Sequence, residues 1–419
     1  MAKIEKVTAR EIFDSRGHPT IEATVILSDR TMGTSSAPSG IKRGTYEVFE
    51  LRDDDRERYE GKGVLKAIEN VNLIIGPGII GSEVTHQQTI DKKMIEMDGT
   101  QNRSKLGGNT ILSVSQAVAK AAAKSSLLPL SVYLKQFLSL RNEGHRIPTP
   151  LFNMIEGGKH ADNGLDFQEF LVIPATSFEY TKSLQIGIAI FNALKEYLKS
   201  ANLPTGVADE GGFAPGFSTN LDAIKALKSA IETTVYPFSK DVFLGLDVAA
   251  SNLVSNRKYS MKDKSGQMDT TELQTFYKSI ISDYSIIYLE DPYAEDDWDA
   301  WKDLYNDIGG NALIVGDDLV CTNPYRLQMA INNSALNGIT VKPSQIGTVT
   351  EALAVAEMAK YKNLKIVVSN RSGETNDDFI ADFAVAVGAD YVKFGAPSHE
   401  RIIKYNRLLE IEQELQKLS

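Results

Sequence analysis

The sequence has very little cysteine: Cys321 is the single one among 419 residues. One cysteine excludes an internal disulfide framework and is typical of a protein from a reducing compartment. The sequence also has no apolar run of the roughly 20 residues that a membrane-spanning helix needs. Residues 1–20 are charged and alternating, without the apolar core of an export signal. We therefore expect a cytoplasmic protein with no membrane partner.

An excess of basic residues is absent as well. The chain has 45 lysines and arginines against 55 acidic residues, a formal net charge of -10. This balance excludes a general nucleic-acid-binding surface, because phosphate backbones require a basic field. It does not exclude a small anionic substrate, since a metal ion and a few placed cations can dominate locally. Apolar residues make up 42% and charged residues 24%, as in ordinary globular proteins of this length with two or three domains.

The first part of the chain predicts a compact α+β domain. Residues 3–28 alternate apolar and polar side chains around a turn at 17–19, which predicts two strands. From about residue 65 to 137 the pattern is helical and rich in alanine. A polar stretch with two prolines, 140–150, is the candidate boundary. We accordingly expect an N-terminal capping domain over residues 1–138 and a second domain over 139–419.

The second part alternates helical segments with short apolar runs. A helical stripe occupies 180–200. The apolar runs that follow are 242–246, 286–289, 313–315, 338–341, 365–368 and 391–392. Buried strands that alternate with helices predict a parallel sheet, and this number of them favours a closed (β/α)8-type barrel. An open doubly wound sheet is the alternative, but the sequence has no glycine fingerprint for a dinucleotide.

Charged residues follow these runs, with the two signs segregated along the chain. In order they are Asp247, Glu290 with Asp291, Asp317 with Asp318, Lys342, Arg371 and Lys393. In a parallel barrel the carboxyl ends of the strands share one face, which carries the active site. One such residue alone is more simply a solvated loop residue or a helix cap. Six in succession instead predict one charged mouth.

The acidic members of this set predict a metal site. Asp247, Glu290 and Asp317 would form an all-oxygen cluster, which suits Mg²⁺. Lys342, Arg371 and Lys393 would face that cluster as anion ligands, or a lysine would act as a base. A lysine beside a metal and another cation should have a lowered pKa, as a base requires.

With these residues in place, the chain resembles the enolase family nearly from end to end. Matching segments occur in order along the whole sequence. They include Asp14-Ser15-Arg16-Gly17, Gln168-Glu169-Phe170, Asp209-Glu210-Gly211-Gly212, Leu246-Asp247-Val248-Ala249-Ala250-Ser251, Glu290-Asp291-Pro292, Gly316-Asp317-Asp318, Gln345-Ile346-Gly347-Thr348 and Arg371-Ser372-Gly373-Glu374-Thr375. Each segment is short, but their number and order are specific.

The resemblance implies an enolase-type barrel and a glycolytic lyase that removes water from 2-phosphoglycerate to form phosphoenolpyruvate. It implies that Lys342 is the general base and that Glu210, with Glu169 and Gln168 beside it, is the acid. The first Mg²⁺ would be held by Asp247, Glu290 and Asp317, and would stabilise the enolate intermediate. The remaining implied roles are a mobile loop carrying His160, phosphate contacts from Arg371 and Ser372, and a carboxylate contact from Lys393.

Four departures from the family pattern bear on the substrate. Lys42 replaces a serine that binds a second Mg²⁺, and Asn370 replaces the histidine before the phosphate-binding pair; both become candidate substrate contacts. Ser344 and Phe394 are the other two. One hypothesis keeps the enolase reaction, with the Lys42 ammonium in place of the second metal. Another is a paralogue retuned for a more anionic or phosphonate substrate, similar to carboxyphosphonoenolpyruvate synthase. A catalytically silent binding protein is the third.

Assembly is the last expectation. Members of the family dimerise through a pair between a glutamate and an arginine. This chain retains the glutamate as Glu22 but has Glu410 where the arginine belongs. Like charges disfavour that contact. We still expect a homo-oligomer.

Overall fold

The N-terminal part is a three-stranded antiparallel sheet covered by helices. The computed structural model describes residues 2–40, 43–139 and 146–417. Strands β1 (Ile4–Phe13), β2 (Pro19–Leu27) and β3 (Met32–Ser36) pair in sequence order. The helices are α1 (Leu65–Asn70), α2 (Gly76–Ile79), α3 (Gln87–Asp98), α4 (Gly108–Ser125) and α5 (Leu130–Lys135). The expected α+β character is confirmed.

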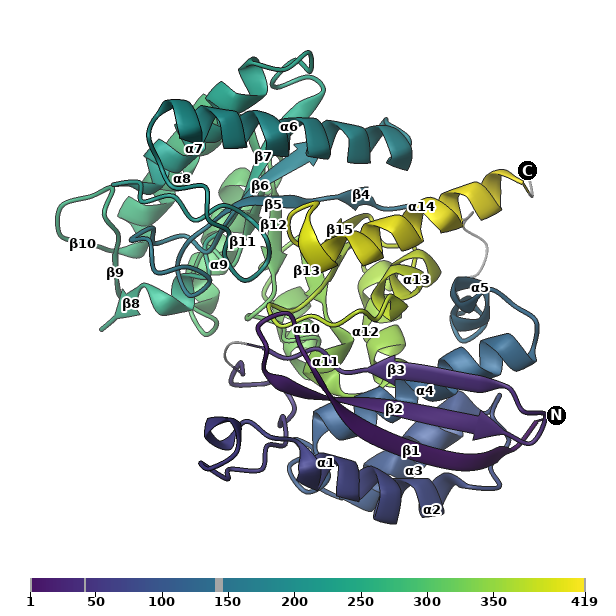
Figure 1. The fold of residues 1–419 in the computed structure, drawn as a ribbon. Coiled ribbons are helices and arrows are strands. Elements are labelled where there is room, and N and C mark those ends of the chain that lie inside the picture. The colour runs from purple at the N-terminus through teal and green to yellow at the C-terminus, as the bar shows by residue number, and fades with distance from the viewer. Residues whose placement is uncertain (1, 41–42, 140–145, 418–419) are drawn as a thin grey trace.

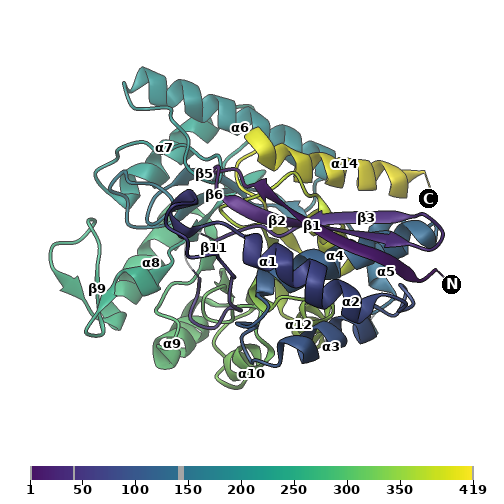
Figure 2. The same cartoon turned by 60° about the horizontal axis from the view of Figure 1, so that its bottom comes forward.

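Helix α4 packs closely on this sheet because both surfaces carry small residues. Its alanines Ala117, Ala121 and Ala122 are fully buried. A Cβ added at Gly33 of β3 would lie 2.2 Å from the carbonyl oxygen of Ala117 and 2.4 Å from the amide nitrogen of Ala121. Figure 2 shows the sheet lying alongside α4. Glycine on the strand therefore permits a helix-to-sheet approach that any side chain would prevent.

The second part is a barrel. Its sheet has the order β4-β15-β14-β13-β12-β11-β7-β6-β5. Only Leu151 separates β4 from β5 along the chain, and its amide donates to Val392 at 2.8 Å, so the sheet closes on itself. The strands are β4 (Thr149–Pro150), β5 (Phe152–Glu156), β6 (Glu169–Pro174), β7 (Val242–Asp247), β11 (Ile286–Glu290), β12 (Leu313–Gly316), β13 (Gly338–Val341), β14 (Lys365–Ser369) and β15 (Tyr391–Lys393).

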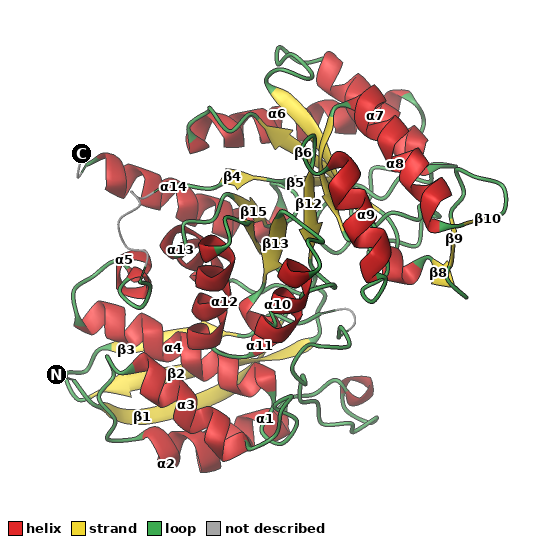
Figure 3. Ribbon diagram, turned by 180° about the vertical axis from the view of Figure 1, so that it is seen from behind, coloured by secondary structure: helices red, strands yellow, loops and turns green. Residues whose placement is uncertain are grey.

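Helices surround this sheet, as Figure 3 shows from behind. They are α6 (Tyr180–Ser200), α7 (Asn220–Glu232), α8 (Thr270–Tyr284), α9 (Trp298–Ile308), α10 (Pro324–Asn332), α11 (Pro343–Ile346), α12 (Val349–Tyr361), α13 (Phe379–Ala386) and α14 (Ile402–Gln416). A small sheet of β8 (Val254–Ser255), β9 (Lys258–Ser260) and β10 (Gln267–Met268) projects from the loop after β7. Helix α14 returns to lie beside α6 (Figure 1). The expected barrel is confirmed.

One strand runs against the others, which the expectation of a parallel sheet did not include. Strand β6 pairs antiparallel with both β5 and β7. The loop 157–168 between β5 and β6 contains no helix, so β6 folds straight back beside β5. Its first residue, Glu169, consequently pairs with Asp247, the last residue of β7. The start of β6 therefore reaches the same end of the barrel as the carboxyl ends of the parallel strands.

Two further expectations concern the surface and the ends of the domains. Within the described residues, Glu22 pairs with Arg10 at 2.6 Å and Glu410 with Arg407 at 3.0 Å, so each acid has a partner in its own chain. The homo-oligomer stays a prediction. The domain boundary between 138 and 139 also stays a prediction, since it lies beside residues 140–145, which the structure does not describe.

No helix in the described part of the chain has both the length and the apolar character to cross a membrane.

Candidate active site

A pocket of about 250 Å³ opens at the mouth of the barrel, facing the N-terminal domain. The predicted site residues that line it are His160, Gln168, Glu169, Glu210, Asp317, Lys342, Arg371 and Ser372. The N-terminal domain adds Gly40, Arg43, Gly44, Thr45 and Glu47 to its lining. The structure thus brings most of the predicted residues to one cavity. Lys42 lies outside the described residues.

Lys393 lies beneath this pocket and joins three carboxylates. Its Nζ is 2.7 Å from Glu290 Oε2, 2.9 Å from Glu169 Oε2 and 3.0 Å from Asp247 Oδ2. Its side chain is 2% exposed. Burial alone would lower the pKa of Lys393, but Asp247, Glu169 and Glu290 hold it well above the usual value. The expected substrate contact is therefore, in this structure, a buried counter-ion that does not line the pocket.

Glu290 is enclosed by hydrogen-bond donors. Its carboxylate accepts from Tyr288 at 2.5 Å and from Thr340 at 2.8 Å in addition to Lys393. The residue is fully buried. Its oxygens are thus held in place by side chains of β11 itself, β13 and β15 before any ligand binds.

Lys342 pairs with the third predicted metal ligand, Asp317, which also accepts from Gln345 Nε2 at 2.9 Å. Burial would lower the pKa of Lys342, but Asp317 raises it above the usual value. The carboxylate partner thus outweighs burial and the nearby cations, and the lowered pKa expected beside a bound metal ion stays a prediction. Gln345 is a pocket residue that the charge pattern did not predict.

The acidic groups nevertheless fit a divalent cation. Burial raises the pKa of Asp247 to about 7. Lys393 acts in the opposite direction, but the nearby carboxylates of Glu290 and Asp317 add to the rise. Burial and Asp317 raise the pKa of Asp318 to about 7. Raised pKa values mean that the positive charge around these carboxylates is not enough to stabilise their ionised forms. A bound Mg²⁺ would supply that charge, and it prefers carboxylate oxygens as ligands.

The spacing of the carboxylates differs from the predicted trio. Among the described residues, the sets of three whose candidate ligand atoms lie within 4.8 Å of one another are Asp291, Asp317 and Asp318, and His160, Glu169 and Glu210. Asp291 accepts hydrogen bonds from the amides of Asp317, at 3.1 Å, and Asp318, at 2.8 Å. It therefore orients the loop after β12. The roles of Asp247, Glu290 and Asp317 as ligands remain a prediction.

A second cluster of carboxylates, Glu156, Glu169 and Glu210, lies around His160. Glu156, at the end of β5, accepts from the amides of Glu210 at 3.1 Å and Gly212 at 2.7 Å. His160 Nδ1 lies 3.5 Å from Glu156 and 3.6 Å from Glu169. Glu156 was not among the predicted residues, because it ends a strand that the sequence pattern did not reveal.

The pKa values in this cluster diverge. Burial raises the pKa of Glu156 and of Glu169 well above the ordinary value. Burial would also raise the pKa of Glu210, but His160, Arg401 and two lysines lower it. Burial lowers the pKa of His160 to about 4. Burial therefore favours the neutral forms of Glu156, Glu169 and His160, whereas the cations around Glu210 favour its carboxylate form.

The wall of the pocket that carries Arg371 and Ser372 is built across the two domains. Arg371 donates to Glu47 of the N-terminal domain at 2.7 Å. Arg401 donates to the main-chain oxygens of Arg371, at 2.6 Å, and Ser372, at 2.5 Å, and so fixes that loop. Neither Glu47 nor Arg401 was predicted, since each acts through a partner far away in the sequence.

Asn370 is the predicted substrate contact that the structure places elsewhere. It is 2% exposed and does not line the pocket. With its amide oriented to satisfy both neighbours, its nitrogen donates to the Lys393 carbonyl at 2.9 Å and its oxygen accepts from Arg401. Its side chain therefore joins the ends of β14 and β15 to the short 3-10 helix 399–401 that precedes α14.

Two family models match the chain. The model described as "Enolase, N-terminal domain" matches residues 4–134. The model described as "Enolase, C-terminal TIM barrel domain" matches residues 144–419. Between them they cover nearly all of the sequence.

Proposed function

The chain belongs to the enolase family, and we propose that it is the magnesium-dependent lyase that dehydrates 2-phosphoglycerate to phosphoenolpyruvate. The observation that carries the proposal is that a lysine and two carboxyl groups line one pocket. Lys342 follows the last residue of β13, and Glu169 and Glu210 line the same pocket, with Glu156 bonded to the Glu210 amide. A base and an acid in one pocket are what removal of a proton and a hydroxyl from adjacent carbons requires.

In this proposal Lys342 Nζ takes the proton from the carbon next to the substrate carboxylate. The ammonium must first lose its own proton, so base action requires the Lys342–Asp317 ion pair to separate. Asp247, Glu290 and Asp317 would hold Mg²⁺, which supplies the positive charge that stabilises the enolate. Their partners Lys393 and Gln345 add donors to the same region.

Loss of the hydroxyl needs a proton from the carboxyl cluster. The pKa values raised by burial at Glu156 and Glu169 favour a stored proton there. Glu210, whose Oε2 is buried without a hydrogen-bond partner in the described residues, would pass that proton to the leaving oxygen. The C–O bond breaks, water leaves, and the electron pair freed from the C–H bond forms the double bond. Arg371 and Ser372 would bind the phosphate.

Measuring the ultraviolet absorbance of the enol product as it forms tests this function. With 2-phosphoglycerate and Mg²⁺ the wild-type protein should turn over, and chelation should abolish the reaction. Lys342→Ala should lose about 100-fold to 10,000-fold in kcat, the range for a general base. Lys365→Ala, a change at an exposed ion pair on the neighbouring strand, is the matched control.

A protein that does not turn over 2-phosphoglycerate would distinguish the two other hypotheses. Absence of turnover, with a thermal unfolding midpoint that Mg²⁺ raises, would favour a retuned enolase-family reaction. Absence of turnover together with an unfolding midpoint that Mg²⁺ does not change would favour a catalytically silent binding protein. The retuned reaction is the second candidate, because Arg43 brings a cation to the pocket beside the family's phosphate contacts.

A further inference from the structure

A second, wider hollow of about 700 Å³ opens beside the active-site pocket. The two share part of their walls, since Gly40, Arg43, Lys159 and His160 line both. A ligand group in one is therefore in direct reach of the other. We call the second hollow the side groove.

The side groove is basic although the whole chain has a formal net charge of -10. Its described lining carries three carboxylates, Glu50, Asp162 and Asp209, against five cations, Arg16, Arg43, Arg52, Lys62 and Lys159. His18 also lines the side groove. Its pKa is lowered by burial and by the nearby charges of Lys62, Arg16 and Arg52, which together outweigh the opposite effect of Asp14. Charges of one sign in a concave surface focus a positive potential there.

Two of these cations are already committed to the fold. Arg16 donates to Ser39 Oγ at 2.8 Å and to Asp14 at 3.2 Å. Arg52 donates to the Lys62 carbonyl at 2.7 Å and pairs with Glu50. Their charges shape the potential, but their donors are occupied.

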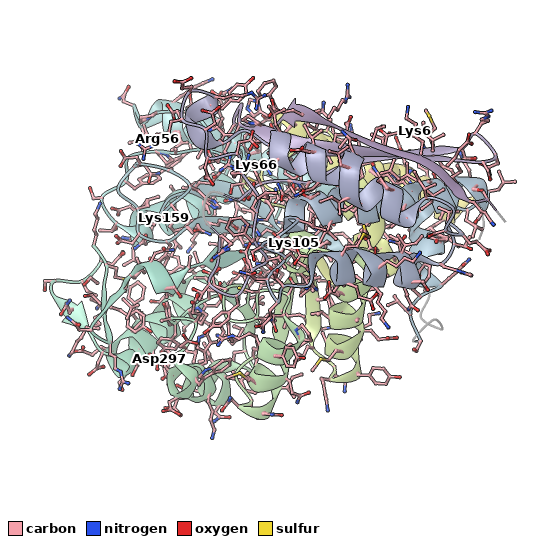
Figure 4. The ribbon with its side chains drawn as sticks, turned by 90° about the horizontal axis from the view of Figure 1, so that it is seen from below. Lys6, Arg56, Lys66, Lys105, Lys159 and Asp297 are labelled. Carbon is pink, nitrogen blue, oxygen red and sulfur yellow. The ribbon has the colours of Figure 1, made fainter. Side chains whose placement is uncertain are left out.

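Arg43 and Lys159 differ from them. Within the part of the chain that the structure describes, neither has a carboxylate within 4.0 Å, and both are exposed. The Arg43 guanidinium lies 5.2 Å from the ring centroid of Phe49, and Lys159 extends from the loop after β5 (Figure 4). They come from different domains and meet at the wall that the pocket and the side groove share. An anion at this junction would receive charge-assisted hydrogen bonds from both sides.

We infer that this enzyme also binds ligands that extend 2-phosphoglycerate by a further anionic oxyacid group, a phosphate, phosphonate or carboxylate, which lies in the side groove between Arg43 and Lys159. The inference rests on the proposed function for the pocket itself and adds a more anionic ligand class to it. The pocket of about 250 Å³ takes the part of the molecule that reacts. The side groove takes an extension that 2-phosphoglycerate lacks.

Calorimetric titration of the full chain with Mg²⁺ present tests this with two probes, 2-phosphoglycerate and 2,3-bisphosphoglycerate. The wild-type protein should bind the bisphosphate at least about tenfold more tightly, the scale of one charge-assisted hydrogen bond. The double variant Arg43→Gln/Lys159→Gln should bring the ratio of the two affinities close to one. The control Lys240→Gln/Lys302→Gln, which removes two exposed lysines outside the side groove, should retain the wild-type ratio. Unchanged thermal unfolding midpoints would show that the variants fold.

Equal affinities in the wild-type protein, or a preference that survives in the double variant, would overturn the inference. Inorganic pyrophosphate is the third probe, added with 2-phosphoglycerate at saturation. Its binding at Arg43 and Lys159 without any preference for the bisphosphate would assign the side groove to a separate anion, and would also overturn the inference.

Turnover separates this inference from the proposed function. Turnover of 2-phosphoglycerate with no bisphosphate preference would refute the second anionic group alone. A bisphosphate preference that depends on the two cations, with no turnover of 2-phosphoglycerate, would refute the proposed reaction and retain the anion site.

Discussion

Replacing Lys393 by methionine should destabilise the barrel strongly, and more at high pH than at low pH. The ammonium is the shared partner of Glu169, Asp247 and Glu290, at 2.7 to 3.0 Å, and is 2% exposed. Methionine fills a similar volume without charge, so the change isolates the loss of the counter-ion. Removing one partner of a buried ion pair costs about 3–5 kcal/mol, because a charge is left uncompensated.

The free energy of protonating one of the three carboxylates gives a second value for this cost. Without the ammonium, at least one of the three carboxyls must become neutral in the folded protein. Holding neutral an aspartic acid whose ordinary pKa is 3.8 costs about 1.4 kcal/mol per pH unit above that value. The cost is about 6 kcal/mol near pH 8 and about 2 kcal/mol near pH 5.5. The folded state then binds more protons than the unfolded state, so its stability falls as the pH rises.

Urea unfolding followed by tryptophan fluorescence measures this cost, with a chelator present to remove divalent ions. The control is Lys365→Met, which breaks an ion pair with Asp390 at 2.7 Å whose lysine side chain is 55% exposed. It should cost less than about 1 kcal/mol at either pH. A cost for Lys393→Met below about 1 kcal/mol near pH 8, or one that does not shrink near pH 5.5, would refute the counter-ion role.

The remaining predictions address the acid cluster, the metal ligands and the packing of the N-terminal domain. Glu156→Gln retains an oxygen acceptor for the Glu210 amide but removes a carboxyl group that can store a proton beside Glu210; kcat should fall while KM stays nearly unchanged, whereas an unchanged kcat would exclude proton storage at Glu156. Asp317→Asn should weaken Mg²⁺ binding by about tenfold or more in calorimetry, and unaltered binding would remove this residue from the ligand set. Gly33→Ala should cost about 2 kcal/mol or more in thermal unfolding because the added Cβ overlaps the main chain of α4. Gly206→Ala, where the Cβ meets nothing within 4 Å, is its control and should be nearly neutral.

The positions of the barrel strands could be predicted from the sequence wherever a strand is a short apolar run between helical segments. The six runs from 242 to 392 all form strands, and each is followed by the charged residue that the sequence placed there. This works because the carboxyl ends of parallel strands must share one face. Strands β5 and β6 escaped the same reasoning, since no helix separates them.

What a charged residue does at the mouth of the barrel depended on partners that are distant in sequence. The local pattern placed Lys342, Lys393 and Arg371 at or just after the ends of strands, where the structure has them. It did not reveal that Asp317 raises the pKa of Lys342, that three carboxylates enclose Lys393, or that Glu47 binds Arg371 from the other domain.

The sequence by itself therefore determined the elements, their order and the face on which the charges gather. These follow from periodicity and from the geometry of a parallel sheet, both of which act over a few residues. Only the tertiary structure decided the protonation states and the pairings. A buried charge responds to every charge within a few ångströms, such as the Glu47 carboxylate 324 residues away from Arg371 along the chain.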